Sequence, residues 1–151
     1  MRALIQRVQS ASVSVEKEVK GEITKGLLVL LGLAPDENKE DFEYISKKIR
    51  ELRIFNDEDG VMNLSLEEVK GEVLLISQFT LHAKTRKGKR PSYIRAAKPD
   101  QAESLYQDFL KQFKRDYQGK VESGIFGADM QVELVNDGPV TLMIDSKNKD
   151  L

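Results

Sequence analysis

Apolar and polar residues alternate across residues 11–16, and this period of two predicts a strand with one buried face within residues 2–16. Lys20-Gly21 predicts a hairpin turn, after which residues 22–24 return as a second strand. Residues 26–33 are almost continuously apolar between glycines. This segment is too short for a confident helix, and it predicts a strand buried on both faces.

Two later segments have the apolar spacing of amphipathic helices. One begins after Pro35, with Asp36 as the expected N-cap, and the other begins at Pro99. The apolar stripe of the first comprises Phe42, Ile45, Ile49 and Leu52, and that of the second comprises Ala102, Leu105, Phe109 and Phe113. Such a stripe is typical of a helix that packs on a core.

The remaining apolar segments predict strands. Residues 72–77 form a buried strand that we expect to continue through Gln78 and Phe79. Residues 130–134 and 140–144 predict two strands joined by a turn at residues 136–139. With no repeat and no linker, this order of elements predicts one α+β domain over residues 1–145. We expect the polar tail, residues 146–151, to fray.

Composition narrows the possible functions. The 24 basic and 25 acidic residues give a net charge of −1, which excludes a protein that binds polyanions through bulk charge alone. The absence of cysteine excludes disulfides, thiolate nucleophiles and Cys-ligated metals, and a single histidine excludes a multi-His metal site. We therefore expect neither a thiolate-ligated nor a multi-His metal site. The chain start lacks an apolar signal core and no apolar run approaches ~20 residues, so we expect a cytoplasmic protein without a membrane partner.

Sequence templates for common catalytic sites are missing. The chain contains no GxSxG, P-loop, GxGxxG or HExxH motif. A Ser-His-Asp triad would need His82, which we expect at a strand end, exposed or hydrogen-bonded, and nothing marks an acid that would orient it. The acidic run at residues 56–60 lacks EF-hand spacing, and we interpret it as a solvated turn.

Three segments remain as candidates for function. Ser77-Gln78-Phe79-Thr80 puts polar side chains at the end of an apolar strand, where they either satisfy local backbone groups or frame an anion site made of free N–H groups. A basic loop at residues 84–90 is either simply solvated or contacts phosphates, and its basic residues are Lys84, Arg86, Lys87, Lys89 and Arg90. Gly138-Pro139 lies in the expected turn, where a cis bond is more common than in other X-Pro sequences.

Taken together, these segments resemble the D-aminoacyl-tRNA deacylase family. Two signature motifs carry the resemblance: Ser77-Gln78-Phe79-Thr80, and Asn136-Asp137-Gly138-Pro139-Val140-Thr141. Residues 26–33, 90–93 and 124–130 provide supporting matches. The resemblance extends from Met1 to about Asp145.

The resemblance implies an enzyme that hydrolyses the ester joining a D-amino acid, or mischarged glycine, to the terminal adenosine of tRNA, and that rejects L-aminoacyl-tRNA. It also implies a compact α+β fold in which antiparallel sheets pack with the two helices. The implied assembly is a homodimer in which a cis Gly138–Pro139 peptide enters the partner subunit's site and selects chirality.

The resemblance also assigns roles within the site, and it implies that the activated ester is hydrolysed without a metal or cofactor. Ser77 lines the pocket, while the backbone of Gln78, Phe79 and Thr80 supplies oxyanion donors. Residues that would bind the terminal adenosine are Phe126, Gly127 and Met130. The basic loop would contact tRNA phosphates, and DNA is not an expected partner.

Other interpretations stay open at this point. The chain could be a non-catalytic RNA-binding module that uses residues 84–90, or a structural homodimer without ligand chemistry. Hydrolysis could also pass through an acyl-enzyme at Thr80. We disfavour that route because the sequence offers no convincing base for the hydroxyl, whereas the ribose hydroxyl beside the ester can position water.

Overall fold

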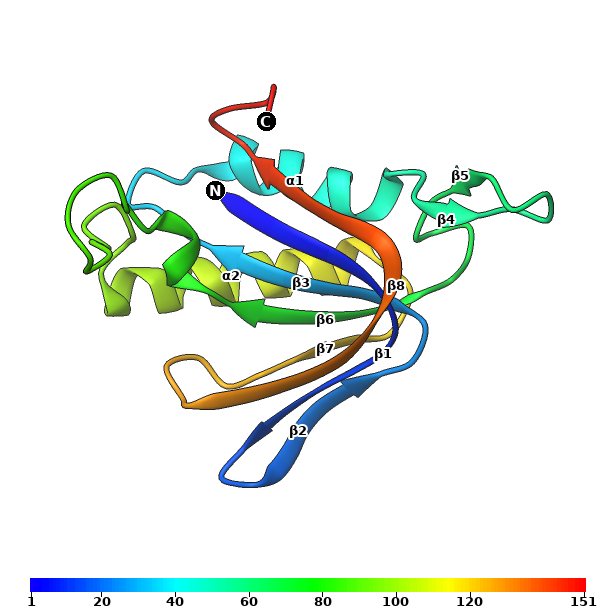
Figure 1. The fold of residues 1–151 in the computed structure, drawn as a ribbon, viewed down its shortest axis with the longest axis horizontal. Coiled ribbons are helices and arrows are strands. Elements are labelled where there is room, and N and C mark those ends of the chain that lie inside the picture. The colour runs from blue at the N-terminus through cyan, green and yellow to red at the C-terminus, as the bar shows by residue number, and fades with distance from the viewer.

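The computed structural model describes residues 1–151 and is organised around one long strand (Figure 1). Strand β1 (Arg2–Val15) pairs antiparallel with β8 (Met130–Asp145) along its whole length. On its other edge, the first half of β1 pairs with β3 (Gly26–Gly32) and the second half with β2 (Glu18–Ile23). Strands β6 (Glu72–Ser77) and β7 (Val121–Ser123) extend the sheet beyond β3, which gives six strands.

The sheet is mixed, because β3–β6 and β6–β7 are parallel pairs. The predicted α+β class with two helices is confirmed, and the expected antiparallel pairing holds except at these two pairs. Parallel neighbours need a long crossover connection, and the two helices lie in these connections. Helix α1 (Lys39–Glu51) follows β3, and α2 (Pro99–Asp116) follows β6.

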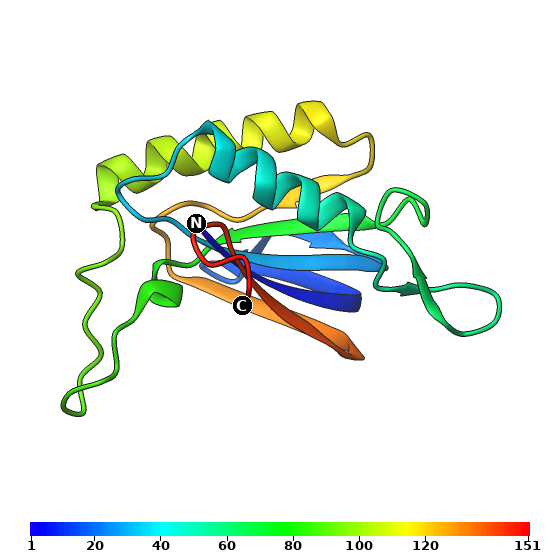
Figure 2. The ribbon, with the colours of Figure 1, turned by 90° about the horizontal axis from the view of Figure 1, so that it is seen from above.

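Both helices cover the same face of the sheet (Figure 2). Their buried residues match the predicted stripes closely, since Phe42, Ile45 and Ile49 of α1 and Phe109 and Phe113 of α2 point into the core. Neither helix is long and apolar enough to cross a membrane. The segment after α1 forms a small hairpin of β4 (Phe55–Asn56) and β5 (Met62–Leu64) around the acidic turn.

The N-cap of α1 is Asn38, not the predicted Asp36. The Asn38 side chain accepts hydrogen bonds from the Glu40 and Asp41 amides, and the Asp41 carboxylate accepts from the Asn38 amide. This reciprocal capping box satisfies donors that the first turn leaves free. Asn38 stands three residues before the acidic Asp41, whereas Asp36 stands three residues before Lys39, which cannot complete a capping box.

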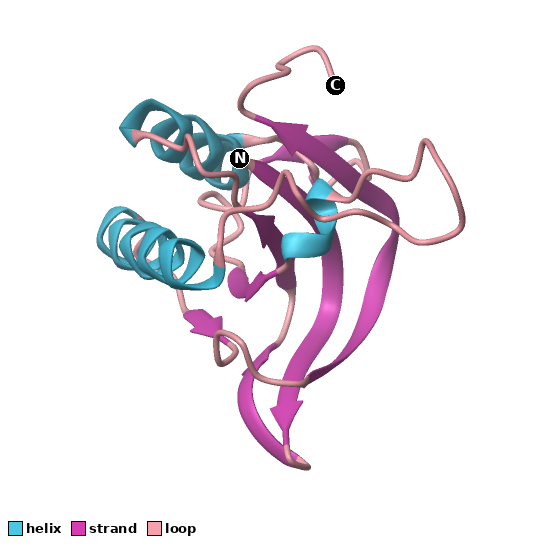
Figure 3. Cartoon of the chain, turned by 90° about the vertical axis from the view of Figure 1, so that its left-hand side faces the viewer, coloured by secondary structure: helices cyan, strands magenta, loops and turns pink.

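The strands bury residues on both sides, as the run at residues 26–33 predicted. One face packs beneath the helices in a core of 22 buried residues that includes Leu27, Val29 and Leu31. The intervening Leu28 points into a second cluster of 7 buried residues on the concave face. Figure 3 shows the strong curvature of the sheet that encloses this second cluster.

The first hairpin turn lies at Glu16–Lys17, and the predicted turn at Lys20-Gly21 is wrong. Both turn residues have positive φ, 52° and 68°, as the type I′ hairpin geometry requires. Gly21 instead lies within β2, where a Cβ atom would stand 3.0 Å from the Ser123 carbonyl oxygen. The glycine therefore allows β2 to approach β7, which brings the two ends of the curved sheet together.

The start of the C-terminal tail is anchored, in contrast to the predicted fraying. Ser146 is buried, and its amide donates to the Met1 carbonyl at 2.9 Å. The next residue, Lys147, donates to the Asp41 carboxylate at 2.8 Å. These contacts hold the chain ends beside each other.

The predicted turn at residues 136–139 is a wide bulge within the single strand β8. Gln6 pairs with Thr141 and Val8 pairs with Asn136, so residues 137–140 lie opposite Arg7 alone. The Asn136 side chain closes the neck of the bulge by donating to the carbonyls of Arg7 at 2.9 Å and Val140 at 3.2 Å. The extra residues are thereby pushed out of the ladder.

Arg7 holds this bulge from beneath. Its buried guanidinium pairs with the Asp137 carboxylate, with 2.9 Å between Nε and Oδ2. The Nη1 atom donates to the Ile54 carbonyl at 2.5 Å and to the Asn56 side chain at 3.2 Å. One side chain therefore ties the bulge of β8 to the β4 hairpin.

We expect Arg7→Gln to lower the free energy of unfolding by about 3–5 kcal/mol, because it leaves Asp137 unpaired and removes the donor to Ile54. The matched control is Lys47→Gln, which removes an equal charge from an exposed i,i+4 pair with Glu51 and should cost under ~1 kcal/mol. Urea denaturation of both variants measures the difference. Equal losses would show that Arg7 does not hold the bulge.

Candidate active site

The polar motif at residues 77–80 lies where β6 ends and a 3-10 turn begins. The expected continuation of the strand is wrong, because β6 stops at Ser77 and residues Phe79–His82 form the turn η1. The Gln78 amide makes the last ladder bond, to the Leu31 carbonyl at 2.7 Å. It is therefore occupied, which corrects the prediction that Gln78 supplies a free backbone donor.

The amides of Phe79 and Thr80 stand at the start of η1, where N–H groups have no partner within the turn. The Gln78 side chain donates to the Thr80 hydroxyl, which fixes that oxygen close to the strand end. The Phe79 side chain is 55% exposed and packs edge-on against Tyr93, with ring centroids 5.0 Å apart. The motif thus presents two backbone donors beside an exposed aromatic ring.

The loop between β7 and β8 follows the neighbouring strand at the same edge of the sheet. Because β6 and β7 are parallel, Ser123 lies beside Leu75, and a Cβ on Gly124 would stand 3.2 Å from the Ile76 side chain. Within this loop, Phe126 is half-buried against the Tyr106 ring, with centroids 5.8 Å apart. The parallel pairing thus brings two of the predicted site segments, residues 77–80 and 124–130, to the same edge.

Two other predicted residues of this loop have distinct surroundings. Gly127 is exposed and has φ of +74°, a conformation that favours glycine. Met130 packs against the concave cluster, and its sulfur occupies the space that a side chain at Gly124 would need. The glycine at position 124 therefore lets Met130 lie over the end of β7.

Tyr106 is buried and packs against Phe126 of the loop between β7 and β8. Its hydroxyl donates to the Leu75 carbonyl at 2.8 Å, and burial raises the pKa of Tyr106 well above its usual range. The phenol stays protonated at neutral pH and keeps its hydrogen bond. We therefore assign it a positioning role and no acid–base chemistry.

The basic loop extends away from the body of the molecule directly after η1 (Figure 2). Two backbone hydrogen bonds between Lys84 and Ser92, at 2.8 and 3.1 Å, close its base. Its five basic side chains are exposed, and none of them forms an ion pair. The loop therefore carries uncompensated positive charge beside the motif at residues 77–80.

Gly138 and Pro139 are exposed in the bulge of β8, and the peptide bond between them is cis. They do not lie beside residues 77–80 of the same chain. Ser77 is in register with Leu31 and, across β3, with Ala3, whereas the bulge is opposite Arg7. Four residues along β1 separate these positions by roughly 13 Å. The predicted site residues therefore form two groups within one chain: residues 77–80 with residues 124–130, and, apart from them, Gly138 with Pro139.

His82 is not at a strand end, and it is not exposed. It is the last residue of η1 and only 6% of its surface is accessible. With three residues per turn, side chains two positions apart in η1 point in different directions, so His82 does not accompany Thr80. This arrangement gives the Thr80 hydroxyl no histidine base and removes the basis for a triad.

The arrangement can bind an oxyanion, stack a flat ring and attract phosphates, and it holds no side chain placed to activate a nucleophile. Sequence reasoning missed three positioning residues: Arg7 beneath the bulge of β8, Tyr106 against Phe126, and Tyr93 against Phe79. Tyr106 carried a partial signal, since it adjoins the predicted stripe of α2. Arg7 carried none, because its partners lie far away in sequence.

Comparison with known proteins identifies relatives over the whole chain. The sequence model of the family described as D-Tyr-tRNA(Tyr) deacylase matches residues 4–145. A D-aminoacyl-tRNA deacylase of Thermosipho africanus is 58% identical over 147 residues, which cover 97% of this chain and 98% of that protein. A protein of the same name from Christiangramia forsetii is 56% identical over 149 residues, 99% of each chain.

Solved structures share the fold of this chain. A chain described as c-Myc DNA Unwinding Element Binding Protein superposes with a TM-score of 0.91 at 39% identity, covering 96% of this chain and 98% of that one. A probable eukaryotic D-amino acid tRNA deacylase shares the fold, with a TM-score of 0.81 at 20% identity over 95% of this chain and 98% of that one. By its match to the family model and its identity to these relatives from end to end, the chain belongs to the D-Tyr-tRNA(Tyr) deacylase family.

Proposed function

We propose that this protein hydrolyses the ester between a D-amino acid, or mischarged glycine, and the 3′-terminal adenosine of tRNA. The observation that carries the proposal is the end-to-end identity of over 50% with D-aminoacyl-tRNA deacylases. The proposed enzyme acts in the cytoplasm, and the use of charged tRNA in translation there supports this part of the proposal.

Oxyanion stabilisation provides the chemistry. An aminoacyl ester is already activated, and the amides of Phe79 and Thr80, which have no partner within the turn, supply donors at the start of η1. A single oxyanion-hole donor is worth about 3–4 kcal/mol of barrier. Gln78 fixes the Thr80 side chain, and Ser77 lines the floor of the site. The ribose hydroxyl next to the ester positions the attacking water, so no side-chain base is needed.

The terminal adenosine occupies the loop between β7 and β8. The half-buried Phe126 ring is held by Tyr106 and offers a fixed surface for stacking, which is worth about 1–3 kcal/mol per base. The exposed backbone at Gly127 allows close approach of the adenine, and Met130 supplies an adaptable apolar contact. This set recognises a feature common to every tRNA.

A second copy of the chain completes each site. Gly138 and Pro139 are exposed and lie away from residues 77–80 of their own chain, so they reach such a motif only in a partner. The outer edge of β8 is unpaired over 16 residues and exposes Val135 and Leu142. A long unpaired strand edge with exposed apolar side chains favours pairing with another chain, which would bury it. A homodimer across β8 satisfies both requirements.

Chirality is enforced by exclusion. In the dimer, the backbone of Gly138 and Pro139 forms a wall against the bound amino acid and accepts hydrogen bonds from its ammonium group. A D side chain points away from this wall, whereas an L side chain would collide with it. Glycine has no side chain to collide, so it is accepted.

We expect the protein to be a dimer of twice its 17.1 kDa mass by light scattering. Val135→Lys should give monomers that fold but do not hydrolyse substrate, because a charge on the edge of β8 opposes its covering. Val61→Lys is the control, since Val61 is equally exposed, at 59% against 56%, but lies outside β8. A monomeric wild-type protein with full activity would contradict the shared site.

Hydrolysis of D-tyrosyl-tRNA and L-tyrosyl-tRNA tests the function directly. We expect kcat/KM to favour the D form by at least about a hundredfold, or ~2.7 kcal/mol of barrier. Binding of uncharged tRNA without turnover would instead support a non-catalytic nucleic-acid-binding module. Absence of both turnover and binding would leave a structural homodimer.

The role of Thr80 is tested by single-turnover hydrolysis of D-tyrosyl-tRNA. Thr80→Ala should lower the rate less than about tenfold, or ~1.4 kcal/mol, because no base activates its hydroxyl. Substrate ending in 2′-deoxyadenosine should lose far more, and Thr24→Ala in the exposed turn between β2 and β3 serves as the control. A trapped acyl-threonine, or a Thr80→Ala enzyme that binds substrate but is inactive, would establish the covalent route.

The basic loop should act through phosphates. Replacing Lys87, Lys89 and Arg90 by glutamine should raise KM for charged tRNA and flatten the slope of log KM against log salt by about two, while kcat changes less than about twofold. The control replaces three exposed cations of α2, Lys111, Lys114 and Arg115. If both triple variants behave alike, the loop has no specific role.

A further inference from the structure

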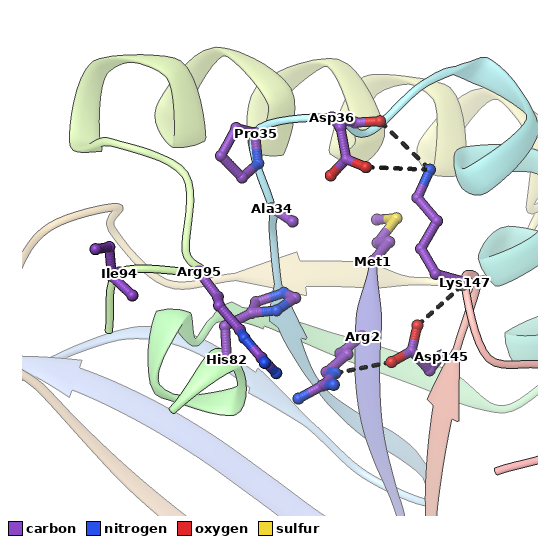
Figure 4. Close-up of a pocket in the computed structure, with 10 residues that line it drawn as sticks. All are labelled: Met1, Arg2, Ala34, Pro35, Asp36, His82, Ile94, Arg95, Asp145 and Lys147. Atoms are coloured by element: carbon purple, nitrogen blue, oxygen red, sulfur yellow. Dashed lines mark hydrogen bonds and ion pairs between the residues drawn. The ribbon is translucent and has the colours of Figure 1, made fainter. Parts of the chain in front are cut away.

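A hollow of about 390 Å³ lies beside η1, separate from residues 77–80 (Figure 4). It is formed by the start of β1, the loop that precedes α1, the end of β8 and the segment that follows the basic loop. The residues that carry the argument are Arg2, His82, Ile94 and Arg95. Its volume falls within the range of small-molecule binding sites.

Most charged groups around the hollow are already paired. Arg2 binds the Asp145 carboxylate at 2.8 Å and the Leu81 carbonyl at 2.9 Å. Lys147 binds Asp41 at 2.8 Å and lies 3.9 Å from Asp36. Arg95 is the exception, because it is exposed and forms no ion pair. The wall of the hollow therefore offers one free guanidinium to an anion.

His82 contributes the second unsatisfied group. Its side chain is buried and lines the hollow, yet Nε2 has no hydrogen-bond partner. Burial lowers the pKa of His82, with a smaller opposing effect from the Gly32 backbone, so the ring is neutral at pH 7. A neutral imidazole has one N–H, and a hydrogen bond to the Gly32 carbonyl uses that N–H. The remaining nitrogen, Nε2, then carries a lone pair and is an acceptor without a donor.

The two groups together define the chemistry of the ligand. It needs a hydrogen-bond donor opposite Nε2 and an anion opposite Arg95 within one small hollow. A ribonucleotide has both on neighbouring atoms, since its 2′-hydroxyl donates next to a phosphodiester. The exposed Ile94 beside them offers an apolar surface to a base.

We propose that this hollow binds a ribonucleotide of the tRNA 3′ strand, upstream of the terminal adenosine, through its 2′-hydroxyl at His82 and its phosphate at Arg95. The placement rests on the proposed function, which supplies the tRNA. It is supported by continuity, because Arg95 follows the basic loop by five residues and His82 shares η1 with the oxyanion donors. The hollow thereby distinguishes RNA from DNA at a position where no chemistry occurs.

The test uses the dimeric enzyme and two uncharged minihelices ending in CCA. One is all RNA, and in the other the 3′ strand is 2′-deoxy except for its terminal adenosine, which keeps the reacting ribose intact. We expect the deoxy minihelix to bind roughly five- to tenfold more weakly, the effect of about one hydrogen bond. His82→Phe should bind both minihelices equally, because it fills the space without an acceptor.

Arg95→Gln keeps the proposal testable if the buried His82 variant does not fold. It should weaken both minihelices and reduce the salt slope of binding by about one, whereas Arg115→Gln on α2 should not. His82 is the only histidine, so its imidazole NMR signals are unambiguous. They should shift on addition of the RNA minihelix and much less with the deoxy one.

Equal binding of the two minihelices by the wild type would overturn the proposal, as would full discrimination in His82→Phe. Competition by free cytidine monophosphate without any deoxy effect would assign the hollow to a free nucleotide and overturn its placement on tRNA. D-tyrosyl-tRNA hydrolysis is measured in parallel. An active enzyme that does not discriminate refutes this inference alone, whereas an inactive one refutes the proposed function.

Discussion

Strand β1 is paired along both of its edges, and this pairing positions the rest of the molecule. On one edge β8 follows it from Arg2–Asp145 to Val15–Met130, and on the other β3 and β2 divide its length. The β1–β8 ladder slips at two places: at Arg7, where four residues of β8 face one of β1, and at Gln9, which has no partner between the pairs Val8–Asn136 and Ser10–Val135. The larger slip is stable because the Arg7 guanidinium and the Asn136 amide bind backbone carbonyls that the ladder leaves unpaired. The exposed Gly138–Pro139 segment therefore results from sheet register.

The sequence predicted those features that depend on local pattern. The buried strand at residues 26–33 and the stripes of both helices were recognisable because side-chain burial repeats with the period of the element. The turn at Glu16–Lys17 was not recognisable, because neither residue is a usual choice for positive φ. The glycine that misled the prediction, Gly21, is required for contact between two strands that are distant in sequence.

The remaining wrong predictions concern features that depend on contacts between residues distant in sequence. The parallel order of β3, β6 and β7 follows from how the helices cross the sheet, and no residue in the strands encodes it. The polar strand end at residues 77–80 was found as a candidate site, but its bend into η1 depends on the ladder bond from Gln78 to Leu31. The burial of His82 likewise depends on the packing of η1 against β3 and β1, which only the assembled sheet creates.

The two halves of the proposed site are held by independent contacts. Residues 77–80 are fixed by the end of a parallel ladder, whereas the Gly138–Pro139 segment is fixed by Arg7 of β1 and Asn136 of β8. Neither half relies on the other for its hydrogen bonds, so each can be formed in a single chain before assembly. In the proposed homodimer, the chemistry would depend on backbone groups that every folded chain presents, and the partner would supply only their juxtaposition. Substitutions in the proposed interface would then abolish catalysis without changing either half, and this is the physical reason for measuring assembly separately from folding.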